Sequence, residues 1–143
     1  MSILVTGGAG FIGSHLIDRL RTEERPTVCL DNFNDYYSPE IKRANVEEAR
    51  RSRYVDVVEG DICDLDLCRQ LFSNHDITRV VHLAARAGVR PSIEEPLLYE
   101  QVNCQGTLNL LECARETDVE MFVFGSSSSV YGVTDRVPFP EDD

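Results

Sequence analysis

The sequence is poor in basic residues. Its 143 residues include 14 Lys and Arg against 25 Asp and Glu, which gives a formal net charge of −11. So acidic a chain disfavours nucleic acid or an anionic membrane as a partner, because both are themselves negatively charged. A phosphorylated small molecule is still compatible with it, since backbone N–H groups can bind phosphate locally.

Patterns typical of membrane, metal-binding and disulfide-bonded proteins are also missing. No apolar run approaches the length of a membrane span, and the histidines show no zinc spacing, so no metal is expected. The cysteines form no C-x-x-C pair, and Cys29, Cys104 and Cys113 lie in apolar runs. This predicts buried, reduced thiols in a cytosolic protein. The first apolar run begins at Ser2, so we expect no signal peptide before it and a cytoplasmic location.

Length and hydrophobic pattern predict a single α/β domain. Short apolar runs alternate with helical segments, and this order is typical of a Rossmann-type, doubly wound parallel sheet with helices on both faces. The predicted strands are Ser2–Thr6, Thr27–Asp31, Tyr54–Glu59, Arg79–Leu83 and Glu120–Gly125. The predicted helices are Phe11–Glu23, Pro39–Arg51, Leu65–Ser73 and Pro96–Thr117.

A glycine-rich turn, VTGGAGFIG, joins the first predicted strand to the first predicted helix. Gly8, Gly10 and Gly13 fit the pattern G-x-G-x-x-G, whereas Gly7, Gly10 and Gly13 fit G-x-x-G-x-x-G. Either pattern lets backbone and the N–H groups of a helix N-terminus approach a pyrophosphate, as in dinucleotide-binding βαβ units. The alternative is a turn without phosphate in some other α/β domain.

An acidic residue, Asp31, ends the second predicted strand. Its distance from the glycines is the one that dinucleotide-binding units use for a carboxylate on the adenosine ribose. Such a carboxylate accepts hydrogen bonds from both ribose hydroxyls and repels a 2′-phosphate. Because Asn32, Phe33 and Asn34 follow it, with no adjacent Lys or Arg, we expect NAD rather than NADP.

Weaker signals follow the third and fourth predicted strands. Asp61 could accept a hydrogen bond from an adenine amino group, or it could cap a turn or a helix. We expect His82 to be a buried, hydrogen-bonded histidine rather than a catalyst. The next loop carries Arg86 and Arg90, which suit an anionic substrate group but are also ordinary surface residues.

The predicted helices carry further hints. The second one alternates Lys and Arg with Glu and includes Lys42, a pattern typical of a solvated face with i,i+4 ion pairs. In the fourth one, Asn103 and Thr107 share a face. Gly106 lies between them, and a glycine costs helix stability, so we expect it to permit close packing.

Several of these stretches resemble one family. The sequence is similar to the extended short-chain dehydrogenase/reductases and, more narrowly, to their NAD-dependent nucleotide-sugar epimerases and dehydratases. The strongest resemblance is to UDP-glucuronate 4-epimerases, through DNFNDYY at 31–37 and AGVR at 87–90. Arg86 stands where those enzymes commonly have Gln, so the sugar stays open between UDP-glucuronate and UDP-glucose. The motifs are VTGGAGFIGS (5–14), LDN (30–32), GDI (60–62), HLAA (82–85), NxxGT (103–107) and SSSSVYG (126–132).

The resemblance implies a cofactor site for NAD. In it the glycines and the first helical amides bind the pyrophosphate, Asp31 holds the adenosine ribose, Asp61 and Ile62 contact adenine, and Asn103 steadies the loops. The implied cofactor-binding residues are Gly7, Gly10, Phe11, Ile12, Gly13, Asp31, Asn32, Asp61, Ile62, Leu83, Ala84, Ala85 and Asn103.

The resemblance also implies a catalytic residue and an activity. Ser127 aligns with the family's catalytic Ser/Thr and would hydrogen-bond the 4-hydroxyl of the sugar, with Ser126 and Ser128 in support and Arg90 as a further substrate-binding residue. The implied reaction is epimerisation through transient oxidation at C4 by hydride transfer to NAD. Dehydratases usually have Asp-Glu where Ser128-Ser129 stand, which argues against 4,6-dehydration. A serine without a base is not a nucleophile.

One family motif is missing: no tyrosine of the sequence has Lys four residues later. In the family, the Tyr of Tyr-x-x-x-Lys is the base. We therefore expect residues 1–143 to be an incomplete NAD-binding domain without the substrate subdomain, inactive alone and homodimeric at full length. Open alternatives are a dehydratase, decarboxylase or reductase of the same family, or a non-catalytic NAD-binding module.

Overall fold

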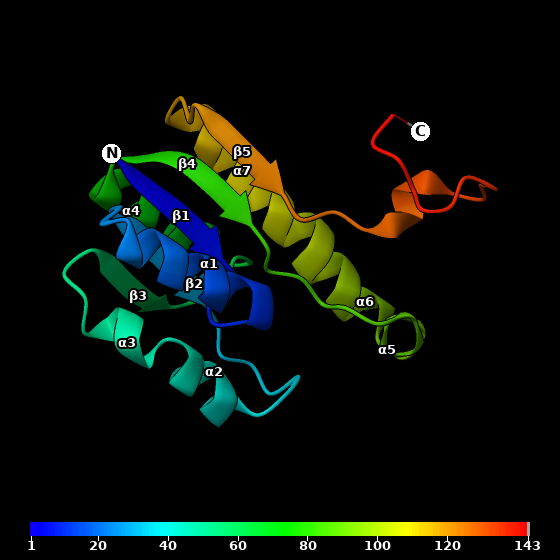
Figure 1. Ribbon diagram of the computed structural model, residues 1–143, viewed down its shortest axis with the longest axis horizontal. Coiled ribbons are helices and arrows are strands. Elements are labelled where there is room, and N and C mark those ends of the chain that lie inside the picture. Colours follow the sequence, from blue (N-terminus) through cyan, green and yellow to red (C-terminus); the bar gives the residue numbers. More distant parts are fainter. Residues whose placement is uncertain (143) are drawn as a thin grey trace.

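Five parallel strands form one sheet through the middle of the computed structural model, which describes residues 1–142 (Figure 1). Their order is β3-β2-β1-β4-β5, and every neighbouring pair is parallel. The central strand β1 pairs with β2 on one side and with β4 on the other, so the strand order reverses there, and in such sheets ligands bind beyond the carboxyl ends at this point. The strands are β1 (Ser2–Thr6), β2 (Thr27–Asp31), β3 (Val55–Glu59), β4 (Ile77–His82) and β5 (Met121–Phe124).

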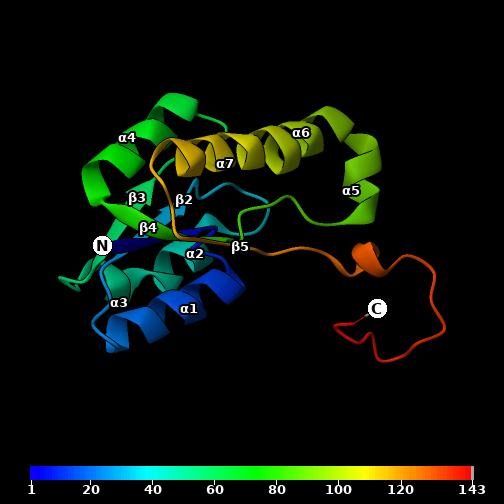
Figure 2. The ribbon, with the colours of Figure 1, turned by 90° about the horizontal axis from the view of Figure 1, so that it is seen from above.

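Helices cover both faces of the sheet. In Figure 2, α4, α6 and α7 lie over one face, and α1, α2 and α3 lie over the other. Within residues 1–142, no helix combines the length and the apolar composition needed to cross a bilayer. The helices are α1 (Phe11–Thr22), α2 (Pro39–Asn45), α3 (Glu47–Arg50), α4 (Leu65–His75), α5 (Val89–Glu94), α6 (Pro96–Glu100), the π-helical turn η1 (Gln101–Gly106), α7 (Thr107–Glu116) and the 3₁₀ turn η2 (Ser128–Tyr131).

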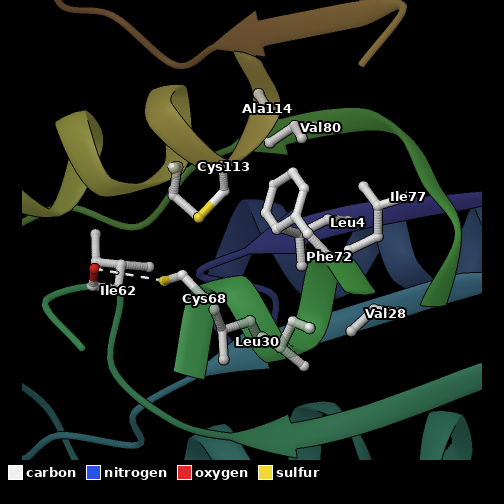
Figure 3. Packing of buried hydrophobic residues seen from close by; sticks show 12 residues of the cluster. Leu4, Val28, Leu30, Ile62, Cys68, Phe72, Ile77, Val80, Cys113 and Ala114 are labelled. Atoms are coloured by element: carbon white, nitrogen blue, oxygen red, sulfur yellow. Dashed lines mark hydrogen bonds between the residues drawn. The ribbon is translucent and has the colours of Figure 1, made fainter. Parts of the chain in front are cut away.

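Two hydrophobic clusters, one on each face, explain why the middle residues of the inner strands are largely apolar. Neighbouring residues of a strand point to opposite faces, and Leu4 and Val5 of β1 are both fully buried, one in each cluster. On the first face Leu4 lies in one cluster with Phe72 of α4 and Cys113 of α7 (Figure 3). On the second face Val5 shares its cluster with Ile17 of α1. The predicted Rossmann-type α/β fold is confirmed.

Strand boundaries were easier to predict than helix boundaries. β1 and β2 have the predicted bounds, and the other strands differ from prediction by at most two residues at either end. The predicted helix over 39–51 is wrong in one respect, because the chain breaks at Val46 into α2 and α3. Val46 is fully buried and leaves helical geometry with φ −111°. The break lets its side chain join the second cluster.

The predicted helix over 96–117 is continuous in course but includes the wider turn η1. The short helix α5 before it was not predicted from the sequence. Pro91 is the third residue of α5, where the missing N–H costs no helical hydrogen bond. A proline there is therefore compatible with a helix.

The cysteines are unpaired, but the prediction for one of them is wrong. Cys29 and Cys113 are buried as expected, and Cys68 is buried as well. Cys104, which lies in η1, is exposed instead. Burial raises the pKa of the Cys29 thiol to about 12, so that thiol stays protonated.

Candidate functional site

A cleft of about 660 Å³, open to solvent, lies at the carboxyl ends of β1, β2, β3 and β4. This is the edge of the sheet where the strand order reverses, and where open α/β sheets bind their ligands. Of the thirteen residues predicted to bind a cofactor, nine line it: Gly7, Gly10, Asp31, Asn32, Asp61, Ile62, Leu83, Ala84 and Ala85. The other lining residues are Leu30, Asn34, Tyr36, Tyr37, Lys42, Gly60, Arg86 and Val102.

The glycine turn forms the floor of the cleft, and its packing requires glycine at two positions. Gly7 has φ +66°, and a Cβ there would lie 2.8 Å from the backbone nitrogen of Ala84. A Cβ on Gly13 would overlap the carbonyl oxygen of Gly7. The turn therefore lies directly against the chain that leaves β4, and backbone rather than side chains faces the cleft.

Helix α1 begins at this turn with its N-terminal end uncapped. Gly10 is the N-cap and supplies no side-chain hydrogen bond, and the first turn carries no acidic residue. The N–H groups of Phe11, Ile12 and Gly13 thus have no intrahelical acceptor, and the positive end of the helix dipole is not neutralised. The side chains of Phe11 and Ile12 are largely exposed and do not line the cleft.

Asp31 lies at the end of β2 and is held by backbone. Its Oδ2 accepts a hydrogen bond from the N–H of Ala9 at 3.1 Å, and its Oδ1 accepts one from the N–H of Phe33 at 2.9 Å. Lys42 adds a positive charge, because its Nζ lies 3.8 Å from Oδ1 of Asp31. This fixes the carboxylate in the cleft wall next to the glycine turn.

Lys42 was predicted to lie on a solvated helix face, and this is wrong. The residue is only 5% exposed, and its Nζ donates to Oδ1 of Asn34 at 2.8 Å. Burial lowers the pKa of Lys42, against the opposing effect of the Asp31 charge. The apolar Ile41 beside it is exposed instead. Nothing in the local sequence pattern indicates that Lys42 is buried and Ile41 is exposed. The burial of Lys42 depends on its partners Asn34 and Asp31, which precede the helix in the chain.

The two interpretations of Asp61 are not exclusive. Its Oδ1 accepts from the N–H of Cys63 at 2.9 Å, which makes it a turn-forming residue, while the N-cap of α4 is Asp64. Its Oδ2 accepts from Nδ2 of Asn32 at 2.9 Å, and both residues line the cleft. Burial opposes ionisation of Asp61, but these hydrogen bonds outweigh it and lower the pKa of its carboxyl.

The opposite wall follows β4 and is held by two side chains from other elements. Oγ1 of Thr6 accepts from the N–H groups of Leu83 and Ala84 at 3.2 Å. Asn103 accepts from the N–H of Arg86 at 2.8 Å and donates to the carbonyl of Arg86 at 2.9 Å. Asn103 does not line the cleft, so it positions the loop without facing a ligand there.

Two tyrosines tie the loops around the cleft together. The hydroxyl of Tyr36 donates to the carbonyl of Ala87 at 2.9 Å, and that of Tyr99 donates to the same carbonyl at 2.6 Å. Tyr36 belongs to the loop after β2, whereas Ala87 belongs to the loop after β4. Neither contact was predicted from the sequence.

His82 is a core residue, as predicted. It is 1% exposed, with Nδ1 2.6 Å from Oγ1 of Thr6 and Nε2 2.9 Å from Oγ1 of Thr107. Burial lowers the pKa of His82 to about 4, so the ring is neutral at pH 7. Gly106 also has its expected role, since a Cβ there would lie 2.6 Å from Cδ1 of Ile62.

The residues predicted for the substrate lie apart from the cleft. Ser126, Ser127 and Ser128 follow β5 and are exposed, and Arg90 is exposed on α5. Oγ of Ser127 accepts from the N–H of Ser129 at 3.2 Å, within the same short segment. None of these residues lines the cleft, so their functional roles stay predictions.

The chain is similar to known proteins over nearly its whole length. The model of the family described as GDP-mannose 4,6 dehydratase matches residues 4–143. "UDP-glucuronate 4-epimerase 4" of Arabidopsis thaliana is 46% identical over 100% of this chain and 33% of its own length. The UDP-glucose 4-epimerase of Erwinia amylovora is 42% identical over 99% of this chain and 41% of its own length.

A solved structure is similar over nearly the whole chain. It is the UDP-glucose 4-epimerase of Brucella ovis in complex with NAD, with a TM-score of 0.83 at 35% identity. The match covers 99% of this chain and 40% of that one. The chain thus spans about a third to two fifths of the length of these relatives.

Proposed function

Because the chain belongs to the family described as GDP-mannose 4,6 dehydratase, we propose that it forms the NAD-binding portion of a nucleotide-sugar 4-epimerase, an isomerase of the UDP-glucuronate or UDP-glucose type. The observation that carries the proposal is the cleft, where an uncapped helix N-terminus and the buried carboxylate of Asp31 border one space. The similarity to 4-epimerases, one of them described in complex with NAD, supports it.

The residues of the cleft fit a dinucleotide. The turn at Gly7 leaves a backbone-lined surface that a Cβ would fill, and the amides of Phe11, Ile12 and Gly13 are available to phosphate oxygens. Asp31 and Asn32 would hold the adenosine ribose, in keeping with NAD rather than NADP. When bound, NAD supplies a hydride acceptor and donor.

The remaining residues of the proposed site would contact the cofactor or hold the strand end beside it. Asp61 and Ile62 would contact adenine, and the strand end from Leu83 to Ala85 would pass beside the cofactor. Asn103 would keep that strand end in place through its two hydrogen bonds to Arg86.

For the sugar, we propose that Ser127 hydrogen-bonds the 4-hydroxyl, with Ser126, Ser128 and Arg90 as further substrate contacts. Ser128-Ser129 in place of Asp-Glu favours epimerisation over dehydration. The sequence contains no Tyr-x-x-x-Lys, so we assign cofactor binding and substrate positioning to this chain and proton transfer to other residues.

We extend the proposal to a homodimer in the cytoplasm. Leu97, Leu108 and Leu111 of α6 and α7 are 82%, 58% and 44% exposed, and apolar side chains grouped on a helix surface favour a protein partner. The five unpaired cysteines suit a reducing compartment. The net charge of −11 disfavours nucleic acid as a partner.

Titration calorimetry of the chain with NAD and with NADP tests the cofactor. We expect NAD to bind, and NADP to bind at least about tenfold more weakly, or about 1.4 kcal/mol, because its 2′-phosphate would meet the Asp31 carboxylate. The Asp31→Asn variant lacks that carboxylate, so its affinities for NAD and NADP should differ less than those of the wild type. Absence of NAD binding to the wild-type chain would overturn the proposal.

The reaction is tested in the natural full-length protein with UDP-glucuronate and UDP-glucose supplied separately. Chromatography and NMR of the sugar should find the C4 epimer of one of them. A 4-keto-6-deoxy product would indicate a dehydratase instead, and a pentose would indicate a decarboxylase.

A further inference from the structure

We propose that Arg86 is a phosphate-binding residue of the cleft, which contacts a phosphate group of the bound nucleotide and thereby determines much of its affinity. This inference rests on the proposed NAD binding and adds a contact to it. The side chain of Arg86 carries a buried donor without an acceptor.

The backbone of Arg86 is held firmly, so its side chain has a defined origin. Asn103 bonds both its N–H and its carbonyl, at 2.8 Å and 2.9 Å. The next carbonyl, that of Ala87, accepts from the hydroxyls of Tyr36 and Tyr99. From this position the side chain lines the cleft.

The guanidinium of Arg86 has unused hydrogen-bonding capacity. Its Nε is the single buried side-chain nitrogen or oxygen within residues 1–142 that lacks a hydrogen-bond partner. Its nearest described π contact is Tyr36, whose ring centre lies 5.9 Å from Cζ, at the outer limit of such an interaction. An arginine offers five N–H donors in a planar fork that matches two phosphate oxygens, and a buried donor without an acceptor is costly.

The other charged residues of the cleft have their partners inside the protein. Asp31 accepts from two backbone N–H groups, Asp61 accepts from Asn32 and Cys63, and Lys42 donates to Asn34. Arg86 alone among them has a buried side-chain donor with no such partner in the described part of the chain.

Arg86 interacts electrostatically with cleft residues of both signs. Burial lowers the pKa of Lys42, Asp31 opposes this effect, and the positive charge of Arg86 adds to it. The same charge lowers the pKa of Asp61, so Arg86 shares one region of the cleft with both residues. A phosphate would give the orphaned Nε a negatively charged acceptor there, which neither adenine nor a ribose hydroxyl supplies.

Calorimetry with ADP, adenosine and NAD separates the phosphate contact from the rest of the nucleotide. Arg86→Gln should weaken the binding of ADP and NAD by about 10- to 100-fold, as expected for loss of a charge-assisted hydrogen bond, and leave adenosine unchanged. Arg86→Lys should lose less affinity for ADP and NAD, because lysine keeps the positive charge but lacks the planar N–H donors of arginine. The wild-type affinity for ADP should also fall more steeply with salt than that of Arg86→Gln.

Arg79→Gln is the matched control. Arg79 lies on β4, the strand that precedes the loop of Arg86, and it is outside the cleft. Arg79→Gln removes the same charge as Arg86→Gln. Because Arg79 lies outside the cleft, salt screens its charge, so the affinity for each of the three ligands should change by no more than about twofold. Thermal melting shows whether each variant is folded. If Arg86→Gln is unfolded, the affinities of Arg86→Lys are compared with those of the wild type instead.

The calorimetric results distinguish failure of the Arg86 contact from failure of the proposed NAD binding. Equal ADP affinity in wild type and Arg86→Gln overturns the inference, and so does an equal loss for adenosine, which would make Arg86 a base contact or a purely structural residue. If ADP binds through Arg86 but NAD does not bind, the proposed function fails while the phosphate contact stands. If neither ADP nor NAD binds the wild-type chain, both are overturned.

Discussion

The cleft and the segment that follows β5 are built in different ways. Around the cleft, side chains hold the strand ends and loops through long-range contacts, such as Asn103 with Arg86 and Thr6 with Leu83. In the segment 126–142, the described contacts link near neighbours, such as Ser127 with Ser129 and Tyr131 stacked on Phe139. Figures 1 and 2 show this segment running away from the sheet.

The difference matters for the two halves of the proposed site. The cofactor half is preformed, because its groups are held by packing and backbone hydrogen bonds before any ligand arrives. The substrate half consists of exposed side chains that the structure does not bring to the cleft. Changes in the cleft should therefore cost more stability than equivalent changes after β5.

Two glycines with nearly the same φ give the largest expected contrast. Gly7 has φ +66°, and a Cβ added there would lie 2.8 Å from backbone of Ala84, whereas Gly132 has φ +63° and nothing within 4 Å. Gly7→Ala should lower the free energy of unfolding by about 4 kcal/mol, from backbone strain and overlap together. Gly132→Ala should lower it by about 2 kcal/mol, from strain alone, because ψ −139° at this positive φ lies outside the left-handed helical region. Urea unfolding followed by circular dichroism measures both, and equal losses would contradict the contrast.

Removing the buried cation of the cleft should have the next largest effect. Lys42→Met leaves the Asp31 carboxylate buried without its nearby positive charge, and we expect a loss of about 3 kcal/mol in unfolding free energy. Arg43→Met is the control on the same helix, because Arg43 and Glu59 form an exposed ion pair, worth at most about 1 kcal/mol. Denaturation at pH 7 compares the two. A smaller loss for Lys42→Met than for Arg43→Met would show that the cleft does not depend on this charge.

The packed region should also be sensitive to acid through His82. Its pKa is lowered from 6.5 to about 4 in the folded protein, so between these values the unfolded chain binds a proton that the folded chain does not. The stability from neutral His82 is thus complete above pH 6.5 and is lost as the pH falls toward 4.

Between pH 7 and pH 5 the expected loss from His82 is about 2 kcal/mol. The measurement is the difference in unfolding free energy between the two pH values, in wild type and in His82→Gln. The variant lacks the group, so its pH dependence should be weaker by that amount. An identical pH dependence in both proteins would refute the assignment.

The smallest change in unfolding free energy is expected for a substitution in the segment after β5. Ser127→Ala removes hydrogen bonds that stay within an exposed turn, so the unfolding free energy should change by no more than about 0.5 kcal/mol. The midpoint of urea unfolding is the readout. A loss as large as that of Lys42→Met would mean that the segment is part of the packed structure after all.

Much of the cleft could be predicted because its residues follow directly from strand ends. Asp31 ends one apolar run and Asp61 closely follows another, and parallel strands bring their carboxyl ends to one edge. Lys42 could not be placed in this way, because its local pattern is that of a surface helix and its position depends on Asn34. Arg86 follows a strand end and was predicted to suit an anionic group, but the sequence left open whether it is an ordinary surface residue. Its backbone position depends on Asn103, which lies elsewhere in the chain.

The sequence by itself determined the alternation of strands and helices, the glycine turn and the acid at the end of β2, because these follow from periodicity and from the conformations that single residues allow. Only the tertiary structure decided that Lys42 is inside, that the chain breaks at Val46, and that Arg86 keeps an orphaned donor in the cleft. The physical reason is that burial and hydrogen bonding depend on what a side chain meets across the fold, and no local pattern contains that information.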